Sequence, residues 1–234
     1  MNSDTFHELV HLAMDSKAKP PETLFAGGFD DWHARARLAH FLSMKEIGKT
    51  EEAIELFRSV SDASVDEDSS EDVEEKVFAM QRLSEIECDQ KDYKKALEHI
   101  NRAIEIAENT DFLYKYILRG ELWAGRWNTM QRMNLGKEAE AEADERIAAY
   151  ADIPIKHNSY LYYGYRFKAQ LAAVRGLHLE AKDYMHMALH AMDVPAEYQP
   201  AIDAAFAATH ENSAWILNQI DHATPNPERI HWDI

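Results

Sequence analysis

The chain is poor in the residues that form tight turns, with only eight glycines and seven prolines among 234 residues. An all-β fold requires many such turns, because short loops rich in these residues join its adjacent strands. Hydrophobic residues make up 46% of the sequence, and a chain of this length is able to bury a substantial core. The composition therefore predicts a folded, all-α protein.

A second cysteine and a long apolar run are also missing. Cys88 is the single cysteine, which excludes an internal disulfide, and its apolar neighbours indicate a buried thiol in a reducing compartment. No segment of the sequence has the ~18 consecutive apolar residues that a membrane-spanning helix needs. The first residues carry acids where a secretory signal is basic. We therefore expect a cytoplasmic protein without a membrane partner.

Basic residues are few relative to acidic ones. The sequence has 25 Lys and Arg against 42 Asp and Glu, which gives a formal net charge of −17. A negative field of this size repels nucleic-acid phosphates and anionic lipid headgroups, so neither is an expected partner. A basic protein would be attracted.

Among the features that are present, Lys91–Ala107 has the clearest helical pattern. Its apolar residues recur three, four and seven positions apart, so they share one face of a helix whose other face is rich in lysine and glutamate. Ala96 and Ala103 allow another helix to approach this face closely, and the preceding Val77–Gln90 is the expected partner. The apolar face consists of Tyr93, Ala96, Leu97, Ile100, Ala103, Ile104 and Ala107.

Together, the two segments resemble a tetratricopeptide repeat (TPR), which is a helical hairpin. The matching positions hold a large apolar residue, a small one, an aromatic, an alanine, a large residue and a second alanine. They are Leu83, Ser84, Tyr93, Ala96, Ile100 and Ala103. The resemblance implies an all-α fold in which antiparallel helix pairs stack in a right-handed superhelix, a TPR-like α-solenoid.

The first hairpin is separated from this one by an acidic insertion. Gly48 matches Lys91 at an offset of about 43 residues, whereas the usual period is ~34. The excess falls in residues 61–75, which are too acidic to bury apolar surface. We therefore predict a solvated loop over 61–75.

Two further hairpins complete the predicted repeat region. In the third, aligning Gly136 and Ala141 with the repeat requires a lengthened first helix at 111–135, whose roughly eleven extra residues make about three turns. Asn158 or Ser159 caps the fourth. The expected organisation is an N-terminal capping helix and linker at 1–30, four hairpins at 31–195, C-terminal capping helices at 196–222 and an extended tail at 223–234.

In this family the first helix of each hairpin lines a concave groove, so the resemblance implies a non-enzymatic module that binds a protein or peptide without a cofactor. Arg119 and Arg166 would hold an acidic or C-terminal carboxylate, because arginine binds one bidentately. The asparagines of the family's carboxylate clamp are absent, and pairing of these cations with neighbouring acids is the alternative. The predicted groove residues are Arg35, Lys45, Phe78, Gln81, Lys115, Arg119, Trp123, Tyr163, Arg166 and Gln170.

The acidic charge supports a different hypothesis. An inhibitor or immunity-type protein neutralises a basic partner through a complementary outer surface, and both the net charge of −17 and the acidic segment 61–75 fit such a role. Binding of this kind weakens steeply as ionic strength rises.

One short motif suggests an enzyme instead. His7, Glu8 and His11 match HExxH, in which two histidines one helical turn apart bind zinc and the glutamate polarises a bound water. A zinc-dependent hydrolase is therefore a further alternative. The sequence specifies no third ligand, and the competing interpretation is a capping helix that docks through Phe6 and Leu9.

A second histidine pair, His186 and His190, also has a one-turn spacing. Zinc binding is geometrically possible there, but no cysteine or further histidine is spaced to complete a four-ligand site. The interpretation we adopt from the sequence is a pair of surface or half-buried histidines.

Overall fold

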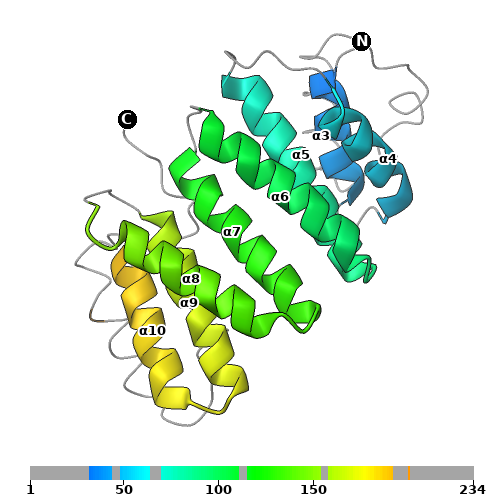
Figure 1. Cartoon of the computed structure of the whole chain (residues 1–234). Helices are drawn as coiled ribbons and strands as arrows, with labels where there is room; N and C mark the ends of the chain where they lie inside the picture. The colour runs from blue at the N-terminus through cyan, green and yellow to red at the C-terminus, as the bar shows by residue number, and fades with distance from the viewer. Residues whose placement is uncertain are drawn as a thin grey trace. The chain divides into compact units, whose positions relative to one another are not determined.

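The structure is a computed structural model that describes residues 32–43, 48–63, 70–110, 115–153, 158–191 and 200. Within these ranges the chain forms eight α-helices and no strand, which confirms the all-α prediction for this part of the chain (Figure 1). None of the described helices is long and apolar enough to cross a membrane.

The chain divides into two compact units, Met1–Lys115 and Tyr116–Ile234, and four helices are described in each. The helices of the first unit are α3 (Trp32–Ser43), α4 (Thr50–Ser61), α5 (Ser70–Asp89) and α6 (Tyr93–Asn109). Those of the second unit are α7 (Lys115–Arg132), α8 (Gly136–Tyr150), α9 (Ser159–Val174) and α10 (His178–Ala191).

In the first unit, α5 packs against α3, α4 and α6. The apolar residues of α4 recur three and four positions apart and are buried, as an amphipathic helix requires. They join residues of α3 and α5 in one hydrophobic cluster. Its buried members are Leu38, Ala39, Phe41, Leu42, Ala53, Ile54, Phe57, Val60, Ala79 and Leu83.

In the second unit, α9 takes the corresponding place and packs against α8 and α10. It also contacts α7, because the ring centres of Trp127 and Phe167 lie 5.5 Å apart. At the start of α9, Asn158 Oδ1 accepts a hydrogen bond of 3.2 Å from Leu161 N, which confirms the predicted cap. In each unit, the first helix of the later hairpin thus contacts both helices of the earlier one.

The turns within the four hairpins have the same backbone conformation. Gly48, Lys91, Asn134 and Gly176 all adopt positive φ, between 63° and 75°, and they follow one another at intervals of about 43 residues. Each of the last three turns is closed by a hydrogen bond of 2.8–2.9 Å. The residue after the left-handed one donates its N–H to the carbonyl of the residue five positions before itself. This is the Schellman ending of a helix, which requires a left-handed residue.

An alanine stands five residues after each of the four left-handed residues. The N–H groups of Ala53, Ala96, Ala139 and Ala181 each donate to the carbonyl four residues earlier, at 3.0–3.1 Å. All four alanines are buried. Because alanine projects only a methyl group, the second helix of each hairpin can pack closely against its neighbours. The described chain therefore contains a structural repeat of about 43 residues.

This repeat corrects the alignment of the third hairpin. The sequence predicts a turn at Gly136 and a buried alanine at Ala141, but the turn is at Asn134 and Ala141 is exposed. Ala139 is buried instead. Asparagine is one of the few non-glycine residues that often adopt the left-handed conformation, and the nearby glycine concealed it.

Helix α5 also begins earlier than predicted. The acidic segment 61–75 was expected to be a loop, yet residues 70–75 belong to α5. Val73 is buried, and acidic residues in the first helical turn interact favourably with the helix dipole. The negative charge of this part of the segment is therefore compatible with a helix.

The turn geometry predicts opposite effects for two glycine substitutions in the first unit. Lys91→Gly removes a side chain from a left-handed residue and should stabilise the unit by about 0.5–1 kcal/mol. Glu98→Gly, at an exposed position inside α6, should destabilise it by a similar amount, about 0.5–1 kcal/mol. Urea unfolding followed by circular dichroism measures both, and a loss of stability in Lys91→Gly would contradict the turn assignment.

The contact between α7 and α9 predicts a steric effect at Gly120. A Cβ atom there would lie 2.4 Å from the backbone carbon and oxygen of Ser159. Gly120→Ala should therefore destabilise the second unit by about 1–3 kcal/mol or more.

Gly136→Ala is the matched control, because the nearest atom to its new Cβ is Gln131 Cγ at 4.0 Å. It should be neutral or stabilise the unit by up to about 1 kcal/mol. Equal urea midpoints for Gly120→Ala and Gly136→Ala would show that α7 and α9 do not approach each other as described.

Candidate functional site

Helix α5 presents an open face that carries an exposed aromatic ring. Phe78, Arg82 and Glu85 are spaced four and three residues apart and therefore share this face. Phe78 is 37% exposed. The Arg82 guanidinium carbon lies 5.7 Å from the centre of the Phe78 ring. The centre of the His40 ring, on α3, lies 5.5 Å from the centre of the Phe78 ring. We call Phe78, Gln81, Arg82 and Glu85 the open face of α5.

Two buried polar groups, one on α5 and one on α3, are incompletely hydrogen-bonded. Gln81 is only 4% exposed, and its Nε2 donates a long hydrogen bond of 3.5 Å to Glu85 Oε1. Its buried Oε1 makes no hydrogen bond, and neither does the buried Nε of Arg35 on α3. Buried polar atoms usually have a partner, so these two atoms are exceptions within the described residues.

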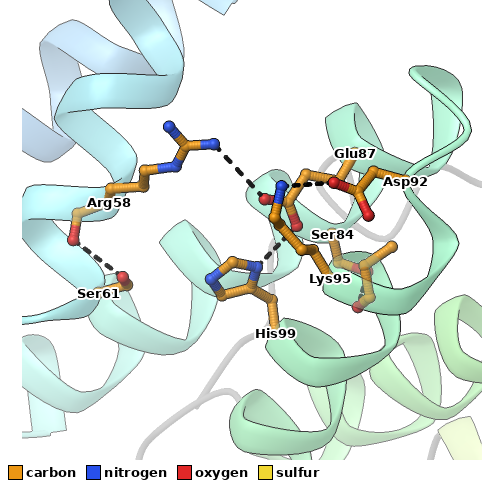
Figure 2. A network of polar contacts seen from close by, with 8 residues as sticks. Arg58, Ser61, Ser84, Glu87, Asp92, Lys95 and His99 are labelled. Atoms are coloured by element: carbon orange, nitrogen blue, oxygen red, sulfur yellow. Dashed lines mark hydrogen bonds and ion pairs between the residues drawn. The ribbon is translucent and has the colours of Figure 1, made fainter.

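The opposite face of α5 holds a buried carboxylate, Glu87, which is 1% exposed (Figure 2). Its Oε2 lies 2.7 Å from Nδ1 of His99 on α6. Its Oε1 lies 3.9 Å from Nη2 of Arg58 on α4, which is too long for a hydrogen bond. Glu87 therefore joins three helices through one hydrogen bond and one longer ion pair.

Two further contacts lie near Glu87. One ties α5 to α6, and the other, drawn in Figure 2, joins α6 to the turn before it. Ser84 Oγ donates a buried hydrogen bond of 2.8 Å to the carbonyl of Ala96. Lys95 Nζ donates one of 2.5 Å to Asp92 Oδ2. This bond holds the pKa of Asp92 below its usual value and that of Lys95 above it. Polar contacts thus join the back of α5 to α6, and α6 to the turn before it.

Glu87 is an exception within the repeat. Glu87 stands four residues before the left-handed Lys91. Met130 and Ala172 hold the equivalent positions before Asn134 and Gly176, and both are buried and apolar. Sequence reasoning missed Glu87, although a signal was present. In the repeat pattern W-x₂-L-G-x₂-Y, Leu83 and Ser84 place Glu87 at the position of the tyrosine. A charged residue at a position that is usually buried indicates a special environment.

In the second unit, α9 carries three of the predicted groove residues on one face. Tyr163, Arg166 and Gln170 are all half-buried. They stand 13, 10 and 6 residues before the left-handed Gly176. Phe78, Gln81 and Glu85 stand at the same three separations before the left-handed Lys91. The two helices therefore place corresponding residues on corresponding faces.

Helix α7 places its predicted groove residues differently. The Arg146 guanidinium carbon of α8 lies 4.1 Å from the centre of the Trp123 ring. On the same face of α7, Arg126 makes a bidentate ion pair with Glu142 of α8, at 2.9 and 2.7 Å. The half-buried Trp123 thus faces α8, and Arg119, one turn before it, shares this face.

Several cations of the second unit pair with acids of α8. Lys168 of α9 pairs with Asp144, and Arg175 pairs with Glu140 through bonds of 3.0 and 2.7 Å. The hydrogen bonds from Arg175 hold the pKa of Glu140 below its usual value. Pairing between cations and acids on neighbouring helices therefore occurs in this unit at Arg126, Lys168 and Arg175.

The remaining predicted site residues are not placed. Lys45 and the zinc motif His7, Glu8 and His11 lie outside the described residues. Lys115 is the first residue of α7, but its side chain is not among those described.

No protein-family model, curated protein or solved structure matches this chain.

The environment of Glu87 predicts that its removal and the removal of its partner have opposite effects. Glu87→Met replaces a buried charge with the apolar residue found at the equivalent position 130, and should be neutral or stabilise the first unit by about 1 kcal/mol. His99→Ala leaves the buried carboxylate without its hydrogen bond and should destabilise the unit by about 1–3 kcal/mol.

Glu85→Met, at an exposed position of the same helix, is the control and should change stability by less than about 0.5 kcal/mol. Chemical unfolding of the three variants tests this prediction. A large loss of stability in Glu87→Met would show that the polar network contributes more than an apolar residue would in its place.

Proposed function

We propose that the chain is a non-enzymatic helical-repeat module that binds an extended protein or peptide segment along the first helices of its hairpins. The four equivalent turns support a TPR-like solenoid, since hairpins with the same turn and the same buried alanine pack in the same way. The period of about 43 residues is longer than the ~34 of the tetratricopeptide repeat, so the likeness lies in the hairpin architecture.

The observation that carries the proposal is the open face of α5. Phe78 is the only aromatic among the exposed large hydrophobic residues of the described chain. It lies beside Arg82, and the incompletely bonded Gln81 shares its face. A partly exposed aromatic surrounded by hydrogen-bonding groups is the usual anchor of a peptide-binding surface.

The corresponding face of α9 adds a cation and a second aromatic. Arg166 lies on the same face as Tyr163 and Gln170, so a guanidinium, a phenol and an amide share this face of α9. These groups suit a carboxylate, from an acidic side chain or a chain terminus, because arginine binds carboxylates with two parallel hydrogen bonds. Glu121 and Asn128 of α7 precede the left-handed Asn134 by the same numbers of residues as Phe78 and Glu85 precede Lys91. The repeat therefore assigns Glu121 and Asn128 to the corresponding face of α7, where the sequence had predicted Arg119 and Trp123.

Binding through the outer helices is the second candidate, and the distribution of exposed acids favours it. The second helices of all four hairpins carry acidic side chains that are open to solvent, including Glu180 and Asp183 on α10. The other three helices supply further examples. They are Glu51 and Glu55 on α4, Glu98 and Glu105 on α6, and Glu138 and Glu145 on α8. A basic partner would be attracted to these helices.

The two candidates are separated by variants of one face at a time. A partner captured from native lysate and identified by mass spectrometry is titrated against the purified wild type and variants. Phe78→Ala should weaken binding at least about tenfold, as expected for an anchor residue. Met187→Ala, which removes an exposed apolar residue from α10, is the control and should leave the affinity unchanged.

A double substitution, Glu98→Lys with Glu105→Lys, tests the outer surface of α6. The outer acidic surface is the binding site if three results occur together. The double substitution weakens binding, the affinity of the wild type falls steeply with added salt, and Phe78→Ala binds as the wild type does. The proposal for the open face of α5 is then wrong.

A further inference from the structure

Helix α10 places two imidazole rings side by side near its C-terminal end. His186 and His190 are one turn apart, their ring centres lie 4.7 Å from each other, and their planes are inclined by 82°. His190 is exposed and His186 is half-buried. Solvent therefore reaches the pair, although each ring belongs to a well-packed helix.

The separation of the rings fits binding of one metal ion by both. A zinc ion binds imidazole nitrogens at about 2.0–2.1 Å, so two imidazoles on a tetrahedral ion have ring centres roughly 5 Å apart. The observed 4.7 Å agrees with this value. A small rotation of the side chains would direct one nitrogen of each ring to the same point, without movement of the helix.

The surroundings favour a cation but supply few further ligands. Asp183, one turn before His186, is exposed, and the chain has a formal net charge of −17, which raises the local concentration of cations. In the described ranges, no group of three or more His, Cys, Asp or Glu side chains is arranged to hold a metal ion. A metal bound here would keep water in its remaining positions.

We propose that His186 and His190 form a two-histidine site for a divalent transition-metal ion such as Zn²⁺, Ni²⁺ or Cu²⁺. Neutral imidazoles bind these ions well, and affinity for a given nitrogen site rises from Ni²⁺ to Cu²⁺. The open water positions make the ion exchangeable, so the site is not a closed structural zinc site. Because the metal bridges one turn, it binds the helical form of residues 186–190 and stabilises it.

The test is calorimetric titration of the full chain with Zn²⁺, and separately with Cu²⁺, in a His7→Ala, His11→Ala background that removes the HExxH motif. The background protein should bind one ion, with Cu²⁺ tighter than Zn²⁺. Because two donors on one helix act as a linked pair, His190→Ala should lower the affinity by about 10²-fold. His186→Ala should have the same effect.

His178→Ala is the matched control, since His178 is a half-buried histidine at the other end of α10, and it should bind as the background does. Nuclear magnetic resonance with Cu²⁺ gives a readout independent of heat, because the imidazole signals of both ligands should broaden before those of the other histidines. The proposal is overturned if His186→Ala and His190→Ala bind Zn²⁺ like the background, or if binding disappears with His7 and His11.

Discussion

The reversal of the chain within each hairpin is the constraint on which the rest of the described structure depends. A single left-handed residue ends the first helix, the following residue starts the second, and a buried alanine then allows close packing. Glycine does this at positions 48 and 176, lysine at 91 and asparagine at 134. The conformation is thus retained where the residue type is not, because packing of the two helices stabilises the turn against the strain of a left-handed side chain.

Helix α5 shows how this architecture connects stability to binding. One face is fixed by the buried Glu87 and its contacts to α4 and α6, and the other presents Phe78 with polar groups. A buried carboxylate with one oxygen lacking a hydrogen bond is a poor source of stability. It does, however, restrict how α5 is oriented between its neighbours, which is the property that a binding surface on the opposite face requires.

Charge is used differently in the second unit. Acids of α8 pair with Arg126 of α7, with Lys168 of α9 and with Arg175, the C-cap residue of α9, so α8 is bonded to the helices on both of its sides. These pairs are partly exposed, and each contributes only about 0–1 kcal/mol. Their number and their bidentate geometry set the register of the helices more than their stability, while Trp127 and Phe167 supply the apolar contact.

The sequence by itself determined the helical fold of the described residues, the buried face of α6 and the cap at Asn158, because periodicity and capping chemistry act over a few neighbouring residues. The predicted loop was wrong for residues 70–75, which belong to α5 and bury Val73, and the turn predicted at Gly136 lies at Asn134. Burial of an apolar side chain extended the helix in the first case, and the tolerance of asparagine for the left-handed conformation set the turn in the second. Only the tertiary structure decided that Trp123 faces α8 and that Glu87 meets His99 and Arg58. Such partners lie on other helices, and local sequence patterns do not specify which side chains a buried charge or ring will contact.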